Sequence, residues 1–359
     1  MHNTRIHRAR GFSLVELMVG LVIGMIGVVI MMQIFSVSEG YKRTTTGGDD
    51  AQNNGAIALY GLQRDLRQAG QGTNSFNGVV PPGAASSLIG CNVTLRAGVT
   101  INANAPVTIN HASIPAGDAN TDTLLVFHSS SNDSPEGEQI AVQPATNIYT
   151  MTGFAAAASA PSIRVGDRVV AHPQTRPSPC NLSVETVASV AGSNVTVGTG
   201  VAGMSNGALF NLGAAPRIVA YAVRGSALTM CDYMVNNCGG AFTASHWVSI
   251  ASNVVSLRAQ YGHDTTAAPM DLTVDAFNQT TPTTECGWVR MRAVRLALVA
   301  RSAQLEKDPV TPTAPSWAAS AAAAIDLSGD ADWQRYRYKV FETVVPLRNV
   351  AWLGVQSGC

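Results

Sequence analysis

A single carboxylate stands inside an otherwise apolar stretch near the start of the chain. Between Phe12 and Phe35 the only charged residue is Glu16, and no polar side chain occurs from Leu17 to Met32. An acid beside hydrocarbon is costly, so Glu16 is a candidate functional residue by default. The chemistry open to it is the neutralisation of a nearby cation, because opposite charges attract more strongly at low dielectric than in water.

The apolar stretch around Glu16 is long enough to cross a bilayer, since roughly 20 residues at about 1.5 Å rise each span the hydrocarbon core. The leading segment carries Arg5, Arg8 and Arg10 and no acid, which by the positive-inside rule holds the N-terminus in the cytoplasm. The stretch exceeds the roughly 7–15 apolar residues of a secretory signal, and no small-x-small cleavage site follows it closely. We therefore expect a membrane-held chain with an exported remainder. The alternative is a plain signal anchor in which Glu16 has no role.

A Gly11-Phe12 pair stands immediately before the apolar stretch. The segment GFSLVEL at residues 11–17 resembles the class III signal of type IV pilins and pseudopilins. The resemblance implies that a prepilin peptidase cleaves between Gly11 and Phe12 and methylates Phe12, so that Glu16 becomes the fifth residue of the mature chain. The free amine of Phe12 is positively charged at neutral pH. The resemblance further implies that Glu16 pairs with this amine, in its own chain or a neighbour, and sets the register of a subunit entering the filament.

The composition favours an exported β-rich protein. The 359 residues have a formal net charge of zero and only 13% are charged. Removing residues 1–11 takes away three arginines and no acid, which leaves the remaining side chains near −3. This balance offers no basic patch, so no nucleic-acid partner is expected.

Six cysteines predict disulfides rather than a metal site. None forms a C-x-x-C pair, and an exported domain meets an oxidising compartment. Cys231 and Cys238 are closest in sequence, so closing the loop between them is cheapest. Fifteen pairings are open, and the sequence does not choose among them. The candidates are Cys91, Cys180, Cys231, Cys238, Cys286 and Cys359.

The helix is expected to continue to residue 70 in two parts. Gly47 and Gly48 each cost about 1 kcal/mol relative to Ala, so we predict a break or a soft middle there. We divide the chain into a leader (1–11, cleaved), a membrane or filament-core helix (12–35), a second helical part (36–70) and a β-rich head (71–359). The second part has an apolar stripe at helical spacing that should lie on the head: Ile57, Leu59, Leu62, Leu66 and Ala69.

The head has the alternation typical of strands. The region 155–160 is Ala-rich, 308–328 reads as a surface loop, and 288–301 is either a short helix leading into a strand or a bulged strand. Pro346 indicates a sheet edge or a strand end. Other strands are expected at 123–128, 140–142, 168–172, 182–190, 194–197, 218–223, 227–230, 254–261 and 336–347.

Some of these segments carry a second resemblance. LQRDLRQAG in the helix, VVSLRAQYG, AVRLALVARS after a Trp, and YKVFETVVPLRN near the end are similar to the PilW family of large minor pilins. That family often has an aromatic residue and a cysteine soon after the helix. Here Gln71 and Gly72 follow, and the next cysteine is Cys91, so no disulfide is carried over.

Other chemistry is weakly indicated. Gly203–Gly207 fits the G-x-S-x-G nucleophile pattern, but no helix is expected after it, which favours a turn. Asp326, Asp330 and Asp332 are a weak calcium candidate, because the spacing of known calcium loops is absent. His263-Asp264 could form a base with its orienting acid, although sequence neighbours rarely point together. No cofactor is otherwise expected.

We therefore expect an α+β fold resembling type IV pilins, with a long N-terminal helix packed on an antiparallel β-sheet and large loop and β insertions. The resemblance implies a minor pilin, not an enzyme, that helps prime assembly at or near the pilus tip. The sequence leaves three uses of the pilus open: twitching motility, adhesion and DNA uptake. Its expected partners are the prepilin peptidase, the inner membrane, other minor pilins, the major pilin and a large tip adhesin. The single-pass chain would place its N-terminus in the cytoplasm and its head in the periplasm before joining the extracellular pilus.

Two alternatives remain. One is a minor pseudopilin of a type II secretion system, which shares the N-terminal motif. The other belongs to a different class, a membrane-anchored periplasmic enzyme or binding module.

Overall fold

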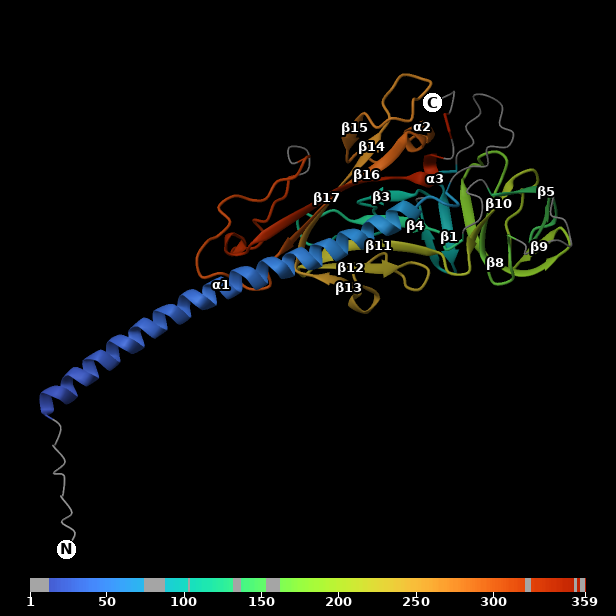
Figure 1. Cartoon of the computed structure of the whole chain (residues 1–359). Coiled ribbons are helices and arrows are strands. Elements are labelled where there is room, and N and C mark those ends of the chain that lie inside the picture. The colour runs from blue at the N-terminus through green and yellow to red at the C-terminus, as the bar shows by residue number, and fades with distance from the viewer. Residues whose placement is uncertain are drawn as a thin grey trace, which may run out of the picture.

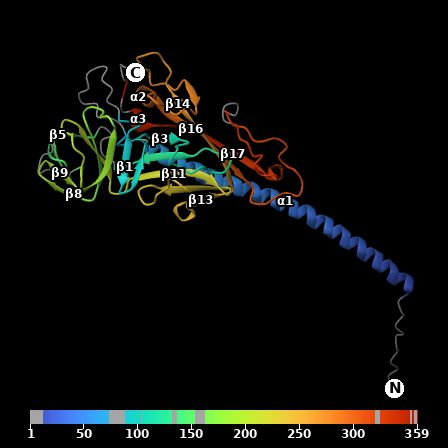
Figure 2. The same cartoon turned by 180° about the vertical axis from the view of Figure 1, so that it is seen from behind.

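The computed structural model describes residues 13–73, 88–102, 104–131, 137–152, 162–319, 324–351, 354–355 and 359. A single long helix, α1 (Leu14–Gln68), carries a β-rich head on its C-terminal half, while its N-terminal half projects away from the head (Figures 1 and 2). The expected α+β fold, a long helix packed on antiparallel strands, is confirmed.

Both ends of α1 are defined by local chemistry. Ser13 is the N-cap, and its Oγ accepts a hydrogen bond from the amide of Val15 at 3.3 Å. At the other end Asn349 donates its side-chain amide to the carbonyls of Gln68 and Ala69, at 3.1 and 3.0 Å. These carbonyls have no partner within the helix, so Asn349 joins the end of α1 to the C-terminal part of the head.

The predicted break in α1 is wrong, because the helix runs without interruption through Gly47 and Gly48. Gly47 is buried, and a Cβ at that position would lie 3.0 Å from the Cβ of Ser302. The glycine therefore lets the helix approach the head closely, and the contact offsets its weak helix propensity.

The predicted apolar stripe is partly wrong. Ile57 is 67% exposed and Leu59 only half-buried, whereas Leu62, Leu66 and Ala69 are buried as expected. The buried face begins earlier and consists largely of small residues at helical spacing: Gly47, Ala51, Gly55, Ala58, Leu62, Leu66 and Ala69. Small side chains bring the helix axis close to the sheets, and this decides which face turns inward.

A four-stranded antiparallel sheet in the order β15-β14-β16-β17 lies against α1. Its strands are β14 (Val254–His263), β15 (Ala276–Asn278), β16 (Met291–Arg301) and β17 (Tyr338–Pro346). The segment at 288–301 takes the helix-then-strand alternative, with α2 (Glu285–Val289) leading into β16. Pro346 is the last residue of β17, the edge strand, as predicted.

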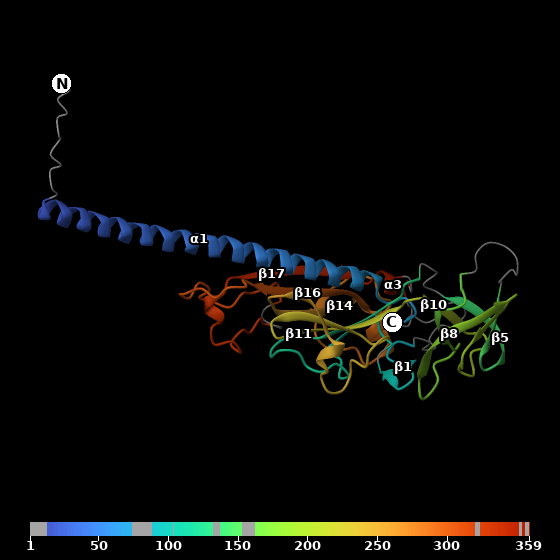
Figure 3. The same ribbon diagram turned by 90° about the horizontal axis from the view of Figure 1, so that it is seen from below.

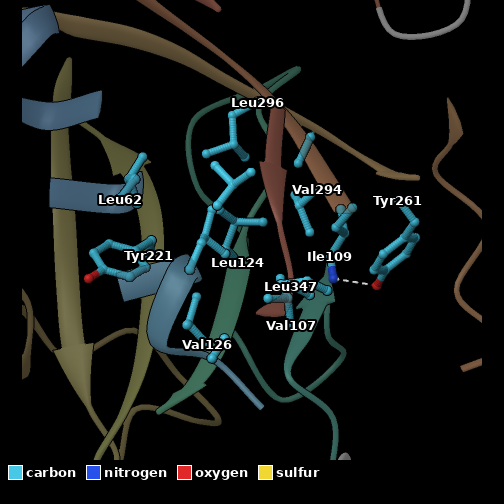
Figure 4. Packing of buried hydrophobic residues seen from close by; sticks show 14 of the residues in the cluster. Leu62, Val107, Ile109, Leu124, Val126, Tyr221, Tyr261, Val294, Leu296 and Leu347 are labelled. Atoms are coloured by element: carbon cyan, nitrogen blue, oxygen red, sulfur yellow. Dashed lines mark hydrogen bonds between the residues drawn. The ribbon is translucent and has the colours of Figure 1, made fainter. Parts of the chain in front are cut away.

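A second antiparallel sheet has the order β13-β12-β11-β4-β3. Its strands are β3 (Val107–Ile109), β4 (Leu124–His128), β11 (Arg217–Arg224), β12 (Ala227–Asp232) and β13 (Val248–Ser252). The main core lies between this sheet, the four-stranded sheet and α1, and it brings together Leu62, Leu124, Tyr221 and Leu296 (Figure 4). In the same core the Ile109 amide donates to the Tyr261 hydroxyl at 2.6 Å.

A small barrel is inserted between β4 and β11. Six strands close into a ring in the order β8-β7-β10-β5-β6-β9, because β9 also pairs with β8. Its interior holds Tyr149, Met151, Val169, Val195 and Leu209, all buried. The strands are β5 (Glu138–Ala145), β6 (Ile148–Met151), β7 (Arg168–His172), β8 (Asn181–Ala191), β9 (Asn194–Val197) and β10 (Ala208–Gly213).

The barrel lies at the end of the head farthest from the N-terminus of α1 (Figures 1 and 3). It is joined to the rest of the head by β1 (Asn92–Arg96), which pairs in parallel with β8 and antiparallel with β2 (Val99–Ile101). The remaining short elements are α3 (Arg348–Ala351) and two 3-10 turns, Ala244–His246 and Trp333–Arg335.

Candidate functional site

The N-terminal half of α1 is apolar on every side. Each large hydrophobic residue from Leu14 to Val37 is at least 50% exposed, including Phe35 at 76%. A helix that is hydrophobic all round must be covered by lipid or by other helices. By length and composition, α1 is the one helix among the described residues that could cross a membrane. The head covers none of this surface, so its partner must lie outside the chain.

Glu16 lies in the first turn of α1, next to the Ser13 N-cap, and its side chain is exposed. The N-terminal end of a helix carries a partial positive charge, which favours an acid in this turn. Gly11 and Phe12 lie outside the described residues. The pairing of Glu16 with the Phe12 amine, and the cleavage and methylation at these two residues, therefore stay predictions.

The C-terminal half of α1 is held to the head by polar groups as well as by its small-residue face. The buried Asp65 accepts a hydrogen bond from the Tyr221 hydroxyl and an ion pair from Arg64 at 3.1 Å. Burial, together with the Asp65 carboxylate, raises the pKa of Tyr221, so the phenol stays protonated and donates. Gln63 donates to Thr343 of β17 at 2.5 Å. The helix is therefore fixed in rotation as well as in position.

The aromatic ring of Phe341 fixes the distance between α1 and β17. A Cβ added at Gly55 would lie 2.1 Å from the Phe341 Cε2, which is far inside van der Waals contact. Only glycine leaves room for the ring at this crossing. The spacing of Gly47, Ala51 and Gly55, four residues apart, is the sequence signal that could have revealed this face.

Asp65 is the residue at this contact that the sequence reasoning missed. It stands between Leu62 and Leu66, and the three share the buried face. An acid on the same helical face as two core leucines needs a buried partner. The partner is Tyr221, 156 positions away, which no local pattern could identify.

All six cysteines are paired in the structure. Cys231 joins Cys238 across the short loop after β12, as the spacing predicts. The other two disulfides join distant segments: Cys91 with Cys180, and Cys286 of α2 with the terminal Cys359. Cys91–Cys180 ties the barrel to the strand pair β1–β2, and Cys286–Cys359 holds the C-terminus against α2.

The weaker sequence candidates are engaged in structural contacts. Ser205 of the G-x-S-x-G segment accepts a hydrogen bond from the Gln143 amide at 3.0 Å, and strand β10 rather than a helix follows it. His263 and Asp264 face different partners. His263 packs near the Tyr261 ring, and Asp264 pairs with Arg290 at 3.7 Å. Neither arrangement has the geometry of a nucleophile with its base.

The three aspartates considered for calcium each have donors of their own. Asp326 accepts from Asn120 at 2.9 Å, and Asp330 and Asp332 form ion pairs with Arg301 and Arg335, at 2.6 and 3.2 Å. These residues act as turn and surface anchors in the described structure.

Comparison with known proteins matches two regions of the chain. Residues 6–32 match the prokaryotic N-terminal methylation motif, which covers the start of α1 and the exposed apolar stretch. Residues 219–349 match the type IV pilus-assembly protein W family, from β11 to α3, and include the four-stranded sheet beneath α1. The inserted barrel lies outside both matches.

No curated protein matches the chain. Among solved structures, a type IV-like pilin from Thermus thermophilus is similar over 52% of this chain and 87% of its own, at 16% identity and a TM-score of 0.24. The methylation motif thus marks the exposed half of α1, and the pilus-assembly domain covers the strands that hold the other half. Together the two matches support a type IV minor pilin of the PilW family.

Proposed function

We propose that this minor pilin helps to prime pilus assembly together with other minor pilins and stays at or near the pilus tip. The observation that carries the proposal is the exposed apolar half of α1, with its one acid in the first turn. Such a helix serves first as a membrane anchor and then as a surface against which the helices of other subunits pack. The same segment therefore supports both membrane insertion and filament entry.

The inserted barrel supports a place at the end of the filament. It extends the head on the side away from the N-terminus of α1 (Figures 1 and 3). If the N-terminal half of α1 points to the membrane, the barrel points outward. In the middle of a filament this space would belong to the head of the preceding subunit, whereas at the tip it is open. The barrel is then the part of the subunit offered to a further partner, for which we propose a large tip adhesin.

We propose that the prepilin peptidase cleaves after Gly11 and methylates Phe12, with the N-terminus in the cytoplasm and the head in the periplasm until extrusion. Replacing Gly11 by Leu should leave a precursor that keeps residues 1–11, because the peptidase needs a small residue before the cut. Mass spectrometry of the membrane fraction reads this directly. A normal N-terminal Phe12 in the variant would contradict the proposed processing.

We further propose that the role is structural, without catalysis and without a cofactor. The contacts of Ser205, His263 and Asp264 support the first part, and the donors that occupy Asp326, Asp330 and Asp332 support the second. Unfolding temperatures measured with calcium and with a chelator should coincide. A higher unfolding temperature with calcium would contradict the proposal that no ion binds.

Deletion of the gene tests the priming role. The deletion strain should lose most surface pili and twitching, and the wild-type gene supplied in trans should restore both. Type II secretion, measured in the same strains as enzyme activity released into the medium, should not change. Normal piliation with lost secretion would assign the chain to the secretion system instead.

A further inference from the structure

A polar cleft of about 550 Å³ lies on the head, apart from α1. Its walls come from β3 and the residues after it, from the loop that precedes α2, and from the connection between β7 and β8 of the barrel. The volume is in the range of sites for small ligands. The lining includes polar side chains and one tryptophan: Thr108, His111, Arg176, Thr281, Thr284 and Trp288.

The cleft carries one formal positive charge. Arg176 lines it at its exposed side, and no aspartate or glutamate is among the described lining residues. Burial lowers the pKa of His111, so this imidazole is neutral near pH 7. Arg176 is held in place by its Nη1, which donates to the Ile89 carbonyl at 3.1 Å. A guanidinium offers five N–H donors and matches a carboxylate well.

Hydroxyl groups line the rest of the cleft. Thr108, Thr281, Thr283 and Thr284 all border it. The Thr108 Oγ1 is buried in a residue only 4% exposed, and it has no hydrogen-bond partner among the described residues. Leaving a buried hydroxyl unpaired is unfavourable, so a ligand group that hydrogen-bonds to it in the cleft would gain binding energy.

Two disulfides hold the walls on either side. Cys91, bonded to Cys180, follows Gly90 of one wall, and Cys180 lies four positions after Arg176. On the other wall Cys286, bonded to Cys359, lies between Thr284 and Trp288. Trp288 is 5% exposed and stands edge-on to Tyr261, with the ring centroids 6.2 Å apart. Walls fixed in this way lose little conformational freedom when a ligand binds.

We propose that this cleft binds a ligand with one carboxylate and several hydroxyls, of the chemical class of uronic-acid saccharides. Arg176 takes the carboxylate, the threonine hydroxyls, Thr108 included, meet the ligand hydroxyls, and Trp288 forms the apolar end. The site is independent of the assembly role of α1. Arg176 belongs to the inserted barrel, outside the region shared with the pilus-assembly family.

Calorimetric titration of the full-length, oxidised protein in detergent tests the site with three probes. Glucuronate carries both features, glucose lacks the carboxylate and glutarate lacks the hydroxyls. Glucuronate should bind at least about tenfold more tightly than either, a difference of about 1.4 kcal/mol. A disaccharide ending in glucuronate then distinguishes two kinds of ligand, the end of a glycan chain and a free sugar acid. Tighter binding of the disaccharide assigns the glycan end, and weaker binding the free acid.

Three variants complete the test. Arg176→Gln should weaken glucuronate binding about tenfold or more and leave glucose unaffected. Thr108→Val, nearly equal in shape, should weaken it several-fold without lowering the unfolding temperature. Arg164→Gln is the matched control, because Arg164 is an exposed arginine of the barrel that does not line the cleft. Absence of glucuronate binding, equal affinity for all three probes, or an Arg176→Gln protein that binds as well as wild type would overturn the proposal.

Discussion

The most informative single residue is Glu16, because the folded head offers it no partner. It lies about a helical turn from the N-terminus that cleavage would create, on a part of α1 that the head does not cover. An acid in an apolar helix opposes membrane insertion. We therefore propose that Glu16 acts in assembly, when a second subunit or the freed amine can approach it.

Replacing Glu16 by Ala should leave a cleaved, stable, membrane-held protein that no longer enters the complex of minor pilins. Removing one member of a buried charge pair costs roughly 3–5 kcal/mol, which is enough to lose a subunit from a small complex. Crosslinking to the other minor pilins and a count of surface pili measure the effect. Glu39→Ala, an exposed acid farther along the same helix, should behave as wild type. Normal piliation with Glu16→Ala would show that the acid has no part in assembly.

At the scale of the element, α1 is one helix with two differently covered halves. The first half is apolar all round, whereas the second presents a narrow face of small residues to the head and an outward face that remains exposed. The same backbone thus continues from the exposed apolar half into the head. The contacts of Asp65, Gln63 and Asn349 fix the head to the second half of α1, so we expect helix and head to move as one unit.

Substitution of two glycines of α1 distinguishes the effect of packing on stability from the effect of helix propensity. Gly55→Ala should destabilise the head by about 1–3 kcal/mol, because the added Cβ overlaps the Phe341 ring. Gly61→Ala meets no atom within 4 Å and should stabilise it by about 0.5–1 kcal/mol through helix propensity. Urea unfolding of the oxidised protein compares the two variants. A Gly55→Ala protein as stable as the Gly61→Ala protein would contradict the close contact between Gly55 of α1 and Phe341 of β17.

At the scale of the molecule, two of the three disulfides tie together parts that are far apart in sequence. Cys91 and Cys180 are 89 positions apart, whereas Cys231 and Cys238 are only 7 apart. In the chain-entropy view a long closed loop restricts the unfolded state more than a short one. The long disulfide also joins the barrel to the rest of the head.

Replacing Cys91 and Cys180 together by Ser should therefore cost more stability than replacing Cys231 and Cys238. The expected losses are about 4–5 and roughly 2–3 kcal/mol. Urea unfolding without reductant measures both, and thiol titration of the wild-type protein should find no free cysteine. Six reactive thiols in protein taken from the periplasm would contradict the disulfides.

Acid should weaken the folded head before its carboxylates titrate. Burial lowers the pKa of His111, His128 and His263. Above about pH 6.5 these residues are neutral in both states and contribute nothing to the pH dependence. Below it the unfolded chain takes up protons that the folded chain refuses, so stability falls as the pH drops from about 6.5 toward the lowered folded values.

Unfolding free energies measured at about pH 7.5 and 5.5 should therefore differ, with the lower value at the lower pH. His128→Leu should reduce this difference, because the buried His128 ring beside the end of α1 no longer titrates. The same substitution at the less buried His246 is the control. Equal stability at the two pH values would contradict the burial of these rings.

The sequence by itself determined the features that depend on neighbours along the chain. The apolar stretch with Glu16, the helix reaching to residue 68, strand β7 at Arg168–His172 and the β8–β9 hairpin follow from local periodicity and turn residues. The α+β class and the membrane-length helix follow from the same signals. The sequence left two alternatives open at residues 288–301. The alternation of apolar and polar residues breaks within this segment, and either a short helix or a bulged strand would explain the break.

Only the tertiary structure decided which distant segments meet. The closure of the barrel, the pairing of Cys91 with Cys180 and the partner of Asp65 depend on contacts across 44, 89 and 156 positions of sequence. The exposure of Ile57 was also decided by the tertiary structure. The face of α1 that packs on the head is the one whose small residues allow the closest approach, and not the most apolar face. Local propensity acts over a few residues, whereas the rotation of a helix and the closing of a ring are set by how well whole surfaces pack.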